Sequence, residues 1–181
     1  MSIFPITVYG DKILRNVAEP VKQVNDETIF NIQSMFETMR NADGVGLAAN
    51  QVGLKDKIFV IDIQPVEGYE HIKPVVMINP EIIEYSDELV IREEGCLSLP
   101  RLRAEVERSK IIKVRYLDTD EKEQEIEADD LFARVILHEY DHLIGKMIPD
   151  RVDSEIKKNL QKELLRIIKR EVEVDYPITE K

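Results

Sequence analysis

The stretch from Asp129 to Gly145 reads DDLFARVILHEYDHLIG, and it predicts a largely buried helix at the centre of the fold. Within it, His138 and His142 lie four residues apart, so their imidazoles share one face of a helix and can bind one metal ion. Glu139 lies off that face, which leaves its carboxylate free to handle the proton of a metal-bound water. The pattern is typical of a hydrolase. The alternative is an accidental pair of surface or core histidines.

The two ends of this helix carry the residue types that favour helix ends. Asp129 and Asp130 open it as N-cap and first-turn acid, and Gly145 is placed to end it. Apolar residues lie along the helix between these ends, at Leu131, Val135, Leu137 and Ile144. A helix with such faces must pack against other elements.

Length and composition favour a compact protein of ordinary size. The chain has 181 residues, 43% of them hydrophobic, so it can bury a full core. We expect one domain over residues 1–181, in which about 153–181 form a C-terminal helix and tail. The net charge of -11 argues against broad binding of DNA. A single cysteine excludes an intramolecular disulfide framework and suits a reducing compartment.

The sequence indicates neither a leader peptide nor a membrane span. Residues 1–7 lack both a basic start and a long apolar run. Further along the chain, no segment reaches the roughly 18 apolar residues that a membrane span requires. We therefore expect a cytoplasmic protein with no membrane partner.

Helical and strand patterns alternate irregularly along the chain. Residues 26–41 carry apolar side chains at helical spacing, and residues 58–63 read as a buried strand. Further elements are predicted as strands at 75–79, 82–85, 89–92, 104–116 and 123–127, then helices at about 129–144 and 153–170. The alternating residues Val172, Val174 and Tyr176 could add a last strand. This order predicts an α+β fold with mixed or antiparallel strands around the central helix.

A glycine-rich segment reads GVGLAANQ at 44–51, and its first six residues formally fit a dinucleotide-binding fingerprint. That fingerprint needs a strand before the glycines and a helix after them, whereas here a helical pattern precedes and a strand follows. Two readings remain. The glycines form a turn after the helix, or they let the backbone approach a ligand while the amide of Gln51 points into a site.

The central helix alone does not complete a metal site. A catalytic metal usually takes three protein ligands and keeps one position open, so the two histidines need a further donor. Cys96, within EEGCLSLP at 93–100, is one candidate. The other reading of a lone cysteine is a small buried hydrophobic residue.

Three blocks, GVGLAANQ at 44–51, EGCLS at 94–98 and HEYDH at 138–142, occur in the order and approximate spacing of peptide deformylases. The chain resembles that family over nearly its whole length. The resemblance implies a hydrolase that removes the N-formyl group from N-formylmethionyl nascent peptides and releases formate. It also implies one divalent metal ion, Fe(II) in the physiological form, although the same ligands suit Zn(II), Ni(II) or Co(II).

The resemblance assigns roles to the residues that match the family's motifs. The metal ligands would be Cys96, His138 and His142, the general base and acid would be Glu139, and the oxyanion would be stabilised by the amide of Gln51 and the backbone N–H of Leu97. Loss of a proton from the water to Glu139 would start attack on the formyl carbon, and return of the proton to the amine would complete hydrolysis.

Substrate binding is implied for residues around the same blocks. The backbone near Gly46 would pair with the substrate peptide as a strand does. An apolar slot for the methionine side chain would be lined by Val45, Leu131 and Val135. Arg103 matches a basic position that the family places near the substrate backbone, and a surface ion pair is its alternative role.

Two further features allow more than one role. Asp141 could orient a ligand imidazole, or it could pair with Arg134 or another cation. The second helix carries basic residues that either dock near the ribosomal exit, as in some family members, or form a solvated face with Glu155 and Glu163. These basic residues are Lys157, Lys158, Lys162, Arg166, Lys169 and Arg170.

Two other classes of protein fit parts of the pattern. A zincin-type metallopeptidase would take its third ligand downstream, from Glu155, Glu163 or another acid, and would leave Cys96 without a role. A noncatalytic metal-binding protein would surround the ion with a closed set of ligands. It would need neither Glu139 nor Gln51.

Overall fold

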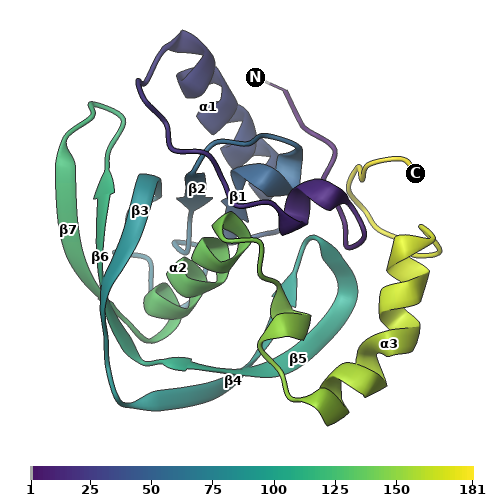
Figure 1. Cartoon of the computed structure of the whole chain (residues 1–181). Helices are drawn as coiled ribbons and strands as arrows, with labels where there is room; N and C mark the ends of the chain where they lie inside the picture. The colour runs from purple at the N-terminus through teal and green to yellow at the C-terminus, as the bar shows by residue number, and fades with distance from the viewer. Residues whose placement is uncertain (1) are drawn as a thin grey trace.

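A computed structural model describes residues 2–181. Two antiparallel sheets enclose the central helix of the fold (Figure 1). The larger sheet has the strand order β1-β2-β3-β6-β7, with bounds Gly46–Ala48, Ile58–Ile61, Val75–Tyr85, Ile111–Leu117 and Glu123–Asp129. The smaller sheet is a hairpin of β4 and β5, at Leu89–Cys96 and Leu99–Ser109. All strand pairings in both sheets are antiparallel. The α+β prediction is confirmed.

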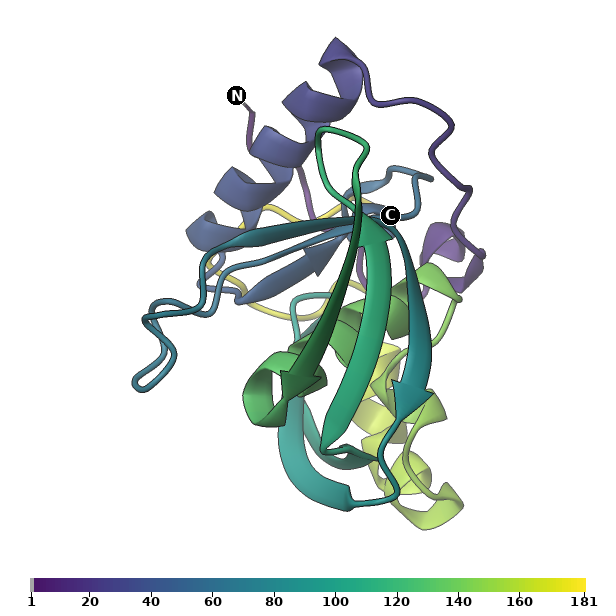
Figure 2. The same ribbon diagram turned by 90° about the vertical axis from the view of Figure 1, so that its left-hand side faces the viewer.

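The enclosed helix is α2, Asp130–Leu143, and it carries the two histidines. Its apolar face packs with side chains of β2, β3 and β6, so the central core lies between the helix and the larger sheet. Figure 2 shows β3, β6 and β7 as a curved layer with α2 packed behind it. Gly145 has a φ of 72° and follows the helix end, as predicted. Asp129 holds the N-cap position and Asp130 is the first-turn acid, as predicted, although the Asp129 side chain accepts no hydrogen bond there.

Helix α1, Asp26–Asn41, begins and ends where the sequence predicted. Asn25 and Thr28 form a capping box that satisfies its first backbone N–H groups. The buried side chains Ile32, Met35 and Met39 pack against β1 and β2 in a second core. Because α1 ends just before the glycine-rich segment, it fixes where that segment enters the sheet.

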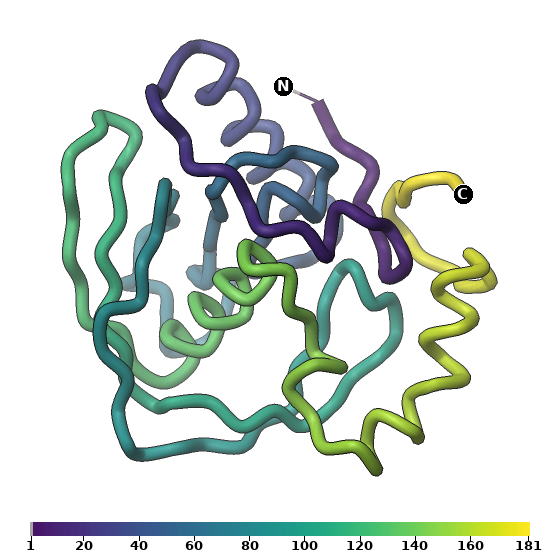
Figure 3. Tube along the Cα trace, in the orientation of Figure 1, coloured from purple at the N-terminus to yellow at the C-terminus, as the bar shows by residue number. Residues whose placement is uncertain are grey.

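Helix α3, Ser154–Ile168, packs against β5 through a third core that includes Leu164 and Ile167. The predicted last strand at residues 172–176 is wrong: the tail there runs as an irregular segment, and only Ile178 forms a parallel bridge, with Ile6. The N-terminal and C-terminal segments therefore lie side by side (Figure 3).

The strands differ from the predicted boundaries in several places, among them β4, which continues beyond residue 92 to Cys96. The two segments at 75–79 and 82–85 are one strand, β3, with a register shift where Asn79 adopts a φ of 52° before Pro80. The segment at 104–116 is divided at Lys110 between β5 and β6. Strand β1 lies inside the glycine-rich segment, for which no strand was predicted. None of the helices in residues 2–181 combines the length and apolar character needed to cross a membrane.

Candidate metal centre and active site

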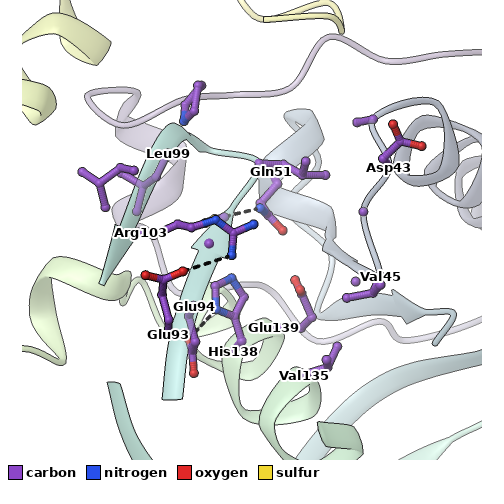
Figure 4. A pocket seen from close by; sticks show the side chains of 18 of the residues that line it. Asp43, Val45, Gln51, Glu93, Glu94, Leu99, Arg103, Val135, His138 and Glu139 are labelled. Carbon is purple, nitrogen blue, oxygen red and sulfur yellow. Dashed lines mark hydrogen bonds and ion pairs between the residues drawn. The ribbon is translucent and has the colours of Figure 1, made fainter. Parts of the chain in front are cut away.

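A cavity of about 500 Å³ opens beside α2. Its walls come from the segment after α1, the turn between β4 and β5, and the side of α2 that carries His138 and Glu139. Figure 4 shows Gln51 on one side of this space and His138 and Glu139 on the other, all directed into it. The residues expected at the site that line the cavity are Val45, Gly46, Gln51, Cys96, Leu97, Arg103, Leu131, Val135, His138 and Glu139. His142 is buried behind them.

Three metal-binding side chains converge at the floor of the cavity. The ligand atoms of Cys96, His138 and His142 all lie within 4.8 Å of one another. Cys96 Sγ lies 3.3 Å from His142 Nε2, which in turn lies 3.3 Å from His138 Nε2. The i, i+4 spacing on α2 brings the imidazoles together, and the end of β4 supplies the sulfur.

This donor set fits a small divalent metal ion. Bonds of about 2.3 Å to sulfur and 2.0–2.1 Å to nitrogen, at tetrahedral angles, place neighbouring donors roughly 3.3–3.6 Å apart. The observed separations match that range without movement of the backbone. His138 turns its Nδ1 to Glu94, at 2.9 Å, and so presents Nε2 to the centre. The buried Nδ1 of His142 has no hydrogen-bond partner in residues 2–181.

Glu139 points into the cavity from α2 next to these donors. Its side chain is 3% exposed, and its Oε2 has no hydrogen-bond partner in the described residues. Burial raises the pKa of Glu139 to about 7, although the neighbouring His138 opposes the shift. A carboxyl group with this pKa can accept and return a proton near neutral pH.

Gln51 faces the same space from the short 3-10 helix Ala49–Val52, which follows β1. Its Oε1 accepts the backbone N–H of Ala48 at 2.8 Å, which fixes the orientation of the amide. Its Nε2 therefore points to the turn between β4 and β5, 3.1 Å from Ser98 Oγ and 3.5 Å from Cys96 Sγ. The amide is a fixed donor at the edge of the donor cluster.

Strand β1 lies at the edge of the larger sheet, because only β2 pairs with it. The free side of an edge strand can pair with an extended peptide. Gly46, in β1, lies so close to α2 that a Cβ atom added there would meet the Glu139 carboxylate. The backbone can approach the site here only because residue 46 has no side chain.

A buried cluster of charges supports the donor residues from behind. Glu94 accepts hydrogen bonds from Arg108 Nε at 2.6 Å, from Arg134 Nη1 at 2.7 Å and from His138 Nδ1 at 2.9 Å. Burial alone would raise the pKa of Glu94, but the hydrogen bonds from His138 and Arg108 outweigh it and hold the pKa well below its usual range. The cluster ties β4, β5 and α2 together at the metal centre.

Asp141 belongs to the same buried cluster. It accepts from Arg108 Nη1 at 2.9 Å and is also paired with Arg151. It does not contact either ligand imidazole directly, and its partner is not Arg134. Of the two expected roles of Asp141, the structure therefore shows an ion pair, and its partners are Arg108 and Arg151.

The residues expected to bind substrate lie around the cavity. Val45, Leu131 and Val135 pack together with the central core and give an apolar side to the cavity. Arg103 lines the opposite wall, is largely exposed and lies 3.8 Å from Glu93. Such a long, exposed ion pair holds the side chain weakly, so Arg103 is free to contact a ligand.

Three side chains of the site went unrecognised in the sequence. Glu94 stands within the EGCLS block, but no local pattern indicates that its carboxylate meets two arginines and the imidazole of His138. Arg108 reaches the cluster from the end of β5, and Tyr176 reaches the cavity from the tail after α3. All three depend on contacts between distant segments, so the sequence carries no local signal for them.

The donor geometry does not favour a third ligand from α3. Glu155 and Glu163 are exposed on that helix, and neither belongs to the donor group that the described residues form. The third donor in that group is Cys96. A metallopeptidase site with a downstream acid therefore has no geometric support in residues 2–181.

Comparisons with known proteins agree on one family. A family model described as polypeptide deformylase matches residues 3–158. The chain is 43% identical to a peptide deformylase of Salinibacter ruber, over 99% of this chain and 95% of the relative. It is 47% identical to that of Rickettsia prowazekii, over 95% of this chain and 99% of the relative.

Solved structures give the same result. The peptide deformylase of Thermotoga maritima matches with a TM-score of 0.78 and 44% identity, over 84% of this chain and 99% of that one. Peptide deformylase 1B of Arabidopsis thaliana matches with a TM-score of 0.85 and 35% identity, over 93% of this chain and 92% of that one. The similarity thus extends to the fold that holds the donor cluster.

Proposed function

The chain belongs to the peptide deformylase family, and on that premise we propose that the cavity beside α2 is its active site. The chain is a hydrolase that removes the N-formyl group from nascent polypeptides, and its family is metal-dependent. One observation supports the placement above all. The sulfur and two imidazoles converge next to a buried carboxyl group, Glu139, whose Oε2 has no partner in residues 2–181.

Cys96, His138 and His142 would hold the metal ion. When bound, the ion would act as a Lewis acid that acidifies a water molecule and polarises the formyl carbonyl. Glu94 would keep the ring of His138 in place through Nδ1, so that Nε2 remains the ligand atom.

Glu139 would move the proton in the reaction. Its Oε2 accepts a proton from the attacking water as the water oxygen bonds to the formyl carbon. When the carbon–nitrogen bond breaks, the same carboxyl group returns the proton to the departing amine. A pKa of about 7 suits both steps, because neither protonation state is strongly disfavoured at neutral pH.

Two donors would stabilise the negative charge on the formyl oxygen. Gln51 Nε2 is oriented by its hydrogen bond with Ala48, and the backbone N–H of Leu97 lies on the turn that the amide faces. The free edge of β1 at Gly46 would align the peptide, and the apolar side of the cavity at Val135 would receive the methionine side chain.

The function is tested by the choice of substrate. Formyl-Met-Ala-Ser should release formate, whereas acetyl-Met-Ala-Ser and unmodified peptides should stay intact, because a deformylase cleaves the formyl amide and a metallopeptidase cleaves internal peptide bonds. Cleavage of internal bonds without formate release would contradict the proposal and restore the metallopeptidase reading.

We propose Fe(II) as the native metal, with Zn(II), Ni(II) or Co(II) accepted by the same donors. A thiolate-bound Fe(II) that is open to solvent oxidises readily. The iron form, prepared without oxygen, should therefore lose activity in air faster than the Ni(II) form. Equal lifetimes, or anaerobic protein that holds another metal, would contradict the assignment.

We also propose that the chain is one catalytic domain and that it works in the cytoplasm, where its substrates are made.

We further propose that α3 contacts the ribosome near the exit. The basic residues that α3 exposes support this contact: Lys157, Lys158, Lys162 and Arg166. A Lys158→Glu, Lys162→Glu variant should co-sediment less with ribosomes and keep its activity on free peptide. Unchanged sedimentation would contradict the contact.

A further inference from the structure

The C-terminal tail returns to the wall of the active-site cavity. Tyr176 lines that cavity, and its hydroxyl donates a hydrogen bond to the backbone carbonyl of Leu97 at 2.9 Å. Burial raises the pKa of Tyr176 to about 12, so the hydroxyl keeps its proton at neutral pH. The residue lies beyond the segment 3–158 that the family model matches. The wall is thus completed by a part of the chain that the family model does not cover.

The Tyr176 hydroxyl binds to the short turn that connects β4 to β5. Cys96 pairs with Leu99 across the hairpin, so Leu97 and Ser98 alone form the turn between them. The carbonyl of Ser98 accepts the N–H of Tyr9 at 2.9 Å, and the carbonyl of Leu97 accepts the hydroxyl of Tyr176. Tyr176 is the one side chain in residues 2–181 that bonds to the backbone of this turn.

Contacts on both sides of Tyr176 anchor the tail. Before it, Arg170 Nη2 donates to Asp11 Oδ1 at 2.6 Å. After it, Thr179 Oγ1 donates to Asp11 Oδ2 at 2.6 Å, and Pro177 O accepts the N–H of Ile6 at 2.9 Å. A residue held on both sides loses little further freedom when its hydroxyl binds, so the Tyr176 contact is preorganised.

We infer that Tyr176 is a positioning residue for the reaction, which holds the Leu97–Ser98 turn so that the N–H of Leu97 faces the formyl oxygen. The inference rests on the proposed function, because it uses the oxyanion role of Leu97. A donor aimed at charge that develops during the reaction affects the transition state more than the bound substrate. Loss of its alignment therefore lowers kcat and leaves KM nearly unchanged.

The test compares two substitutions that each remove one hydroxyl group. Tyr176→Phe keeps the ring in the cavity wall and deletes the donor. Tyr85→Phe is the control, because Tyr85 is 57% exposed and its hydroxyl makes no hydrogen bond in residues 2–181. Both proteins are studied as full chains, with Ni(II) for the kinetics and with diamagnetic Zn(II) for the NMR spectra. The measurements are kcat and KM for formyl-Met-Ala-Ser, metal per chain, the unfolding temperature and the amide NMR signal of Ser98.

The Ser98 signal reports the contact directly, because its N–H shares a peptide group with the carbonyl of Leu97. Tyr176→Phe should shift this signal and lower kcat about threefold to tenfold, the range expected for one neutral hydrogen bond. KM, metal content and unfolding temperature should stay close to wild type, and Tyr85→Phe should change nothing. A kcat equal to that of the wild type would overturn the inference. So would a threefold to tenfold loss of kcat/KM that comes from KM alone.

Failure of the proposed function would look different. A wild-type chain that releases no formate would contradict the function itself. In that case an unshifted Ser98 signal in Tyr176→Phe would also overturn the structural part of the inference, and a shifted signal would support it.

Discussion

Glu139 illustrates how the surroundings of one residue decide its chemistry. The i, i+4 pair places His138 and His142 toward the donor cluster, and the intervening carboxylate faces the cavity beside them. Its burial raises the pKa to about 7, and its free Oε2 has no competing partner in the described residues. We therefore expect different side chains to do the two tasks: the histidines bind the metal, and Glu139 transfers the proton.

That separation predicts the behaviour of Glu139→Gln. The substitution keeps the shape of the side chain and removes the basic oxygen, so the metal should stay while formate release falls by about a hundredfold to ten-thousandfold. Binding of the product-like peptide Met-Ala-Ser should change little. Metal per chain and the turnover of formyl-Met-Ala-Ser are measured on the same preparation. A variant with one metal and near-normal turnover would show that another group moves the proton.

The sequence could predict the residues whose role depends on local spacing. Two histidines and a glutamate on one helix are visible in five consecutive residues, and the structure places them as expected. From the residues alone, the part played by Cys96 stayed open, and only the family resemblance indicated it. Glu94 and Tyr176 could not be predicted, because their partners lie in other strands and in another part of the chain.

At the scale of elements, the site depends on how α2 meets β1 and the β4–β5 hairpin. The buried cluster around Glu94 joins the hairpin to α2, and the absence of a side chain at Gly46 lets β1 lie against Glu139. Neither contact was visible in the strand pattern. The sequence predicted α1 and α2 well because their apolar spacing is regular over three turns or more, whereas β1 is only three residues long.

The charge cluster predicts a large difference between two neighbouring glutamates. Glu94→Gln leaves Arg134 buried without a carboxylate and leaves Arg108 with Asp141 as its one carboxylate partner, so it should lower the free energy of unfolding by about 3–5 kcal/mol. It should also weaken metal binding about tenfold to a hundredfold through His138. Glu93→Gln is the control, because Glu93 is exposed and should change stability by less than about 0.5 kcal/mol.

Urea unfolding of the metal-free variants, with a separate metal titration, measures both effects. If the two variants unfold at the same urea concentration, the buried cluster does not stabilise the fold.

The close approach of β1 to α2 predicts the effect of Gly46→Ala. The added Cβ atom would meet the Glu139 carboxylate and push it aside, while the metal ligands are not touched. We expect metal content to stay near one per chain and kcat to fall by about a hundredfold, as displacement of a catalytic group by about 1 Å can cause. A kcat within twofold of wild type would show that the carboxylate tolerates the displacement.

At the scale of the whole molecule, the segment around Ile6 pairs with the C-terminal tail, which lines part of the cavity. Ile6 bridges to Ile178, and the anchors at Asp11 hold the tail on which Tyr176 lies. The predicted strand at 172–176 was wrong: Val172 packs into the core shared with α3 and β5, Tyr176 lines the cavity, and the segment has no partner strand in residues 2–181. Alternation predicts a surface that is buried on one side. It does not supply the neighbouring strand.

The central claim is that this chain removes formyl groups through one metal ion held by Cys96, His138 and His142. The most direct measurement strips the full chain with a chelator, adds Ni(II) in steps, and follows formate release from formyl-Met-Ala-Ser. The account predicts no release from the stripped chain, a linear rise and a plateau at one metal per chain. Cys96→Ala should bind metal weakly and stay nearly inactive over the same range. Full activity in the stripped chain, or a wild-type plateau that Cys96→Ala reproduces, would contradict the account.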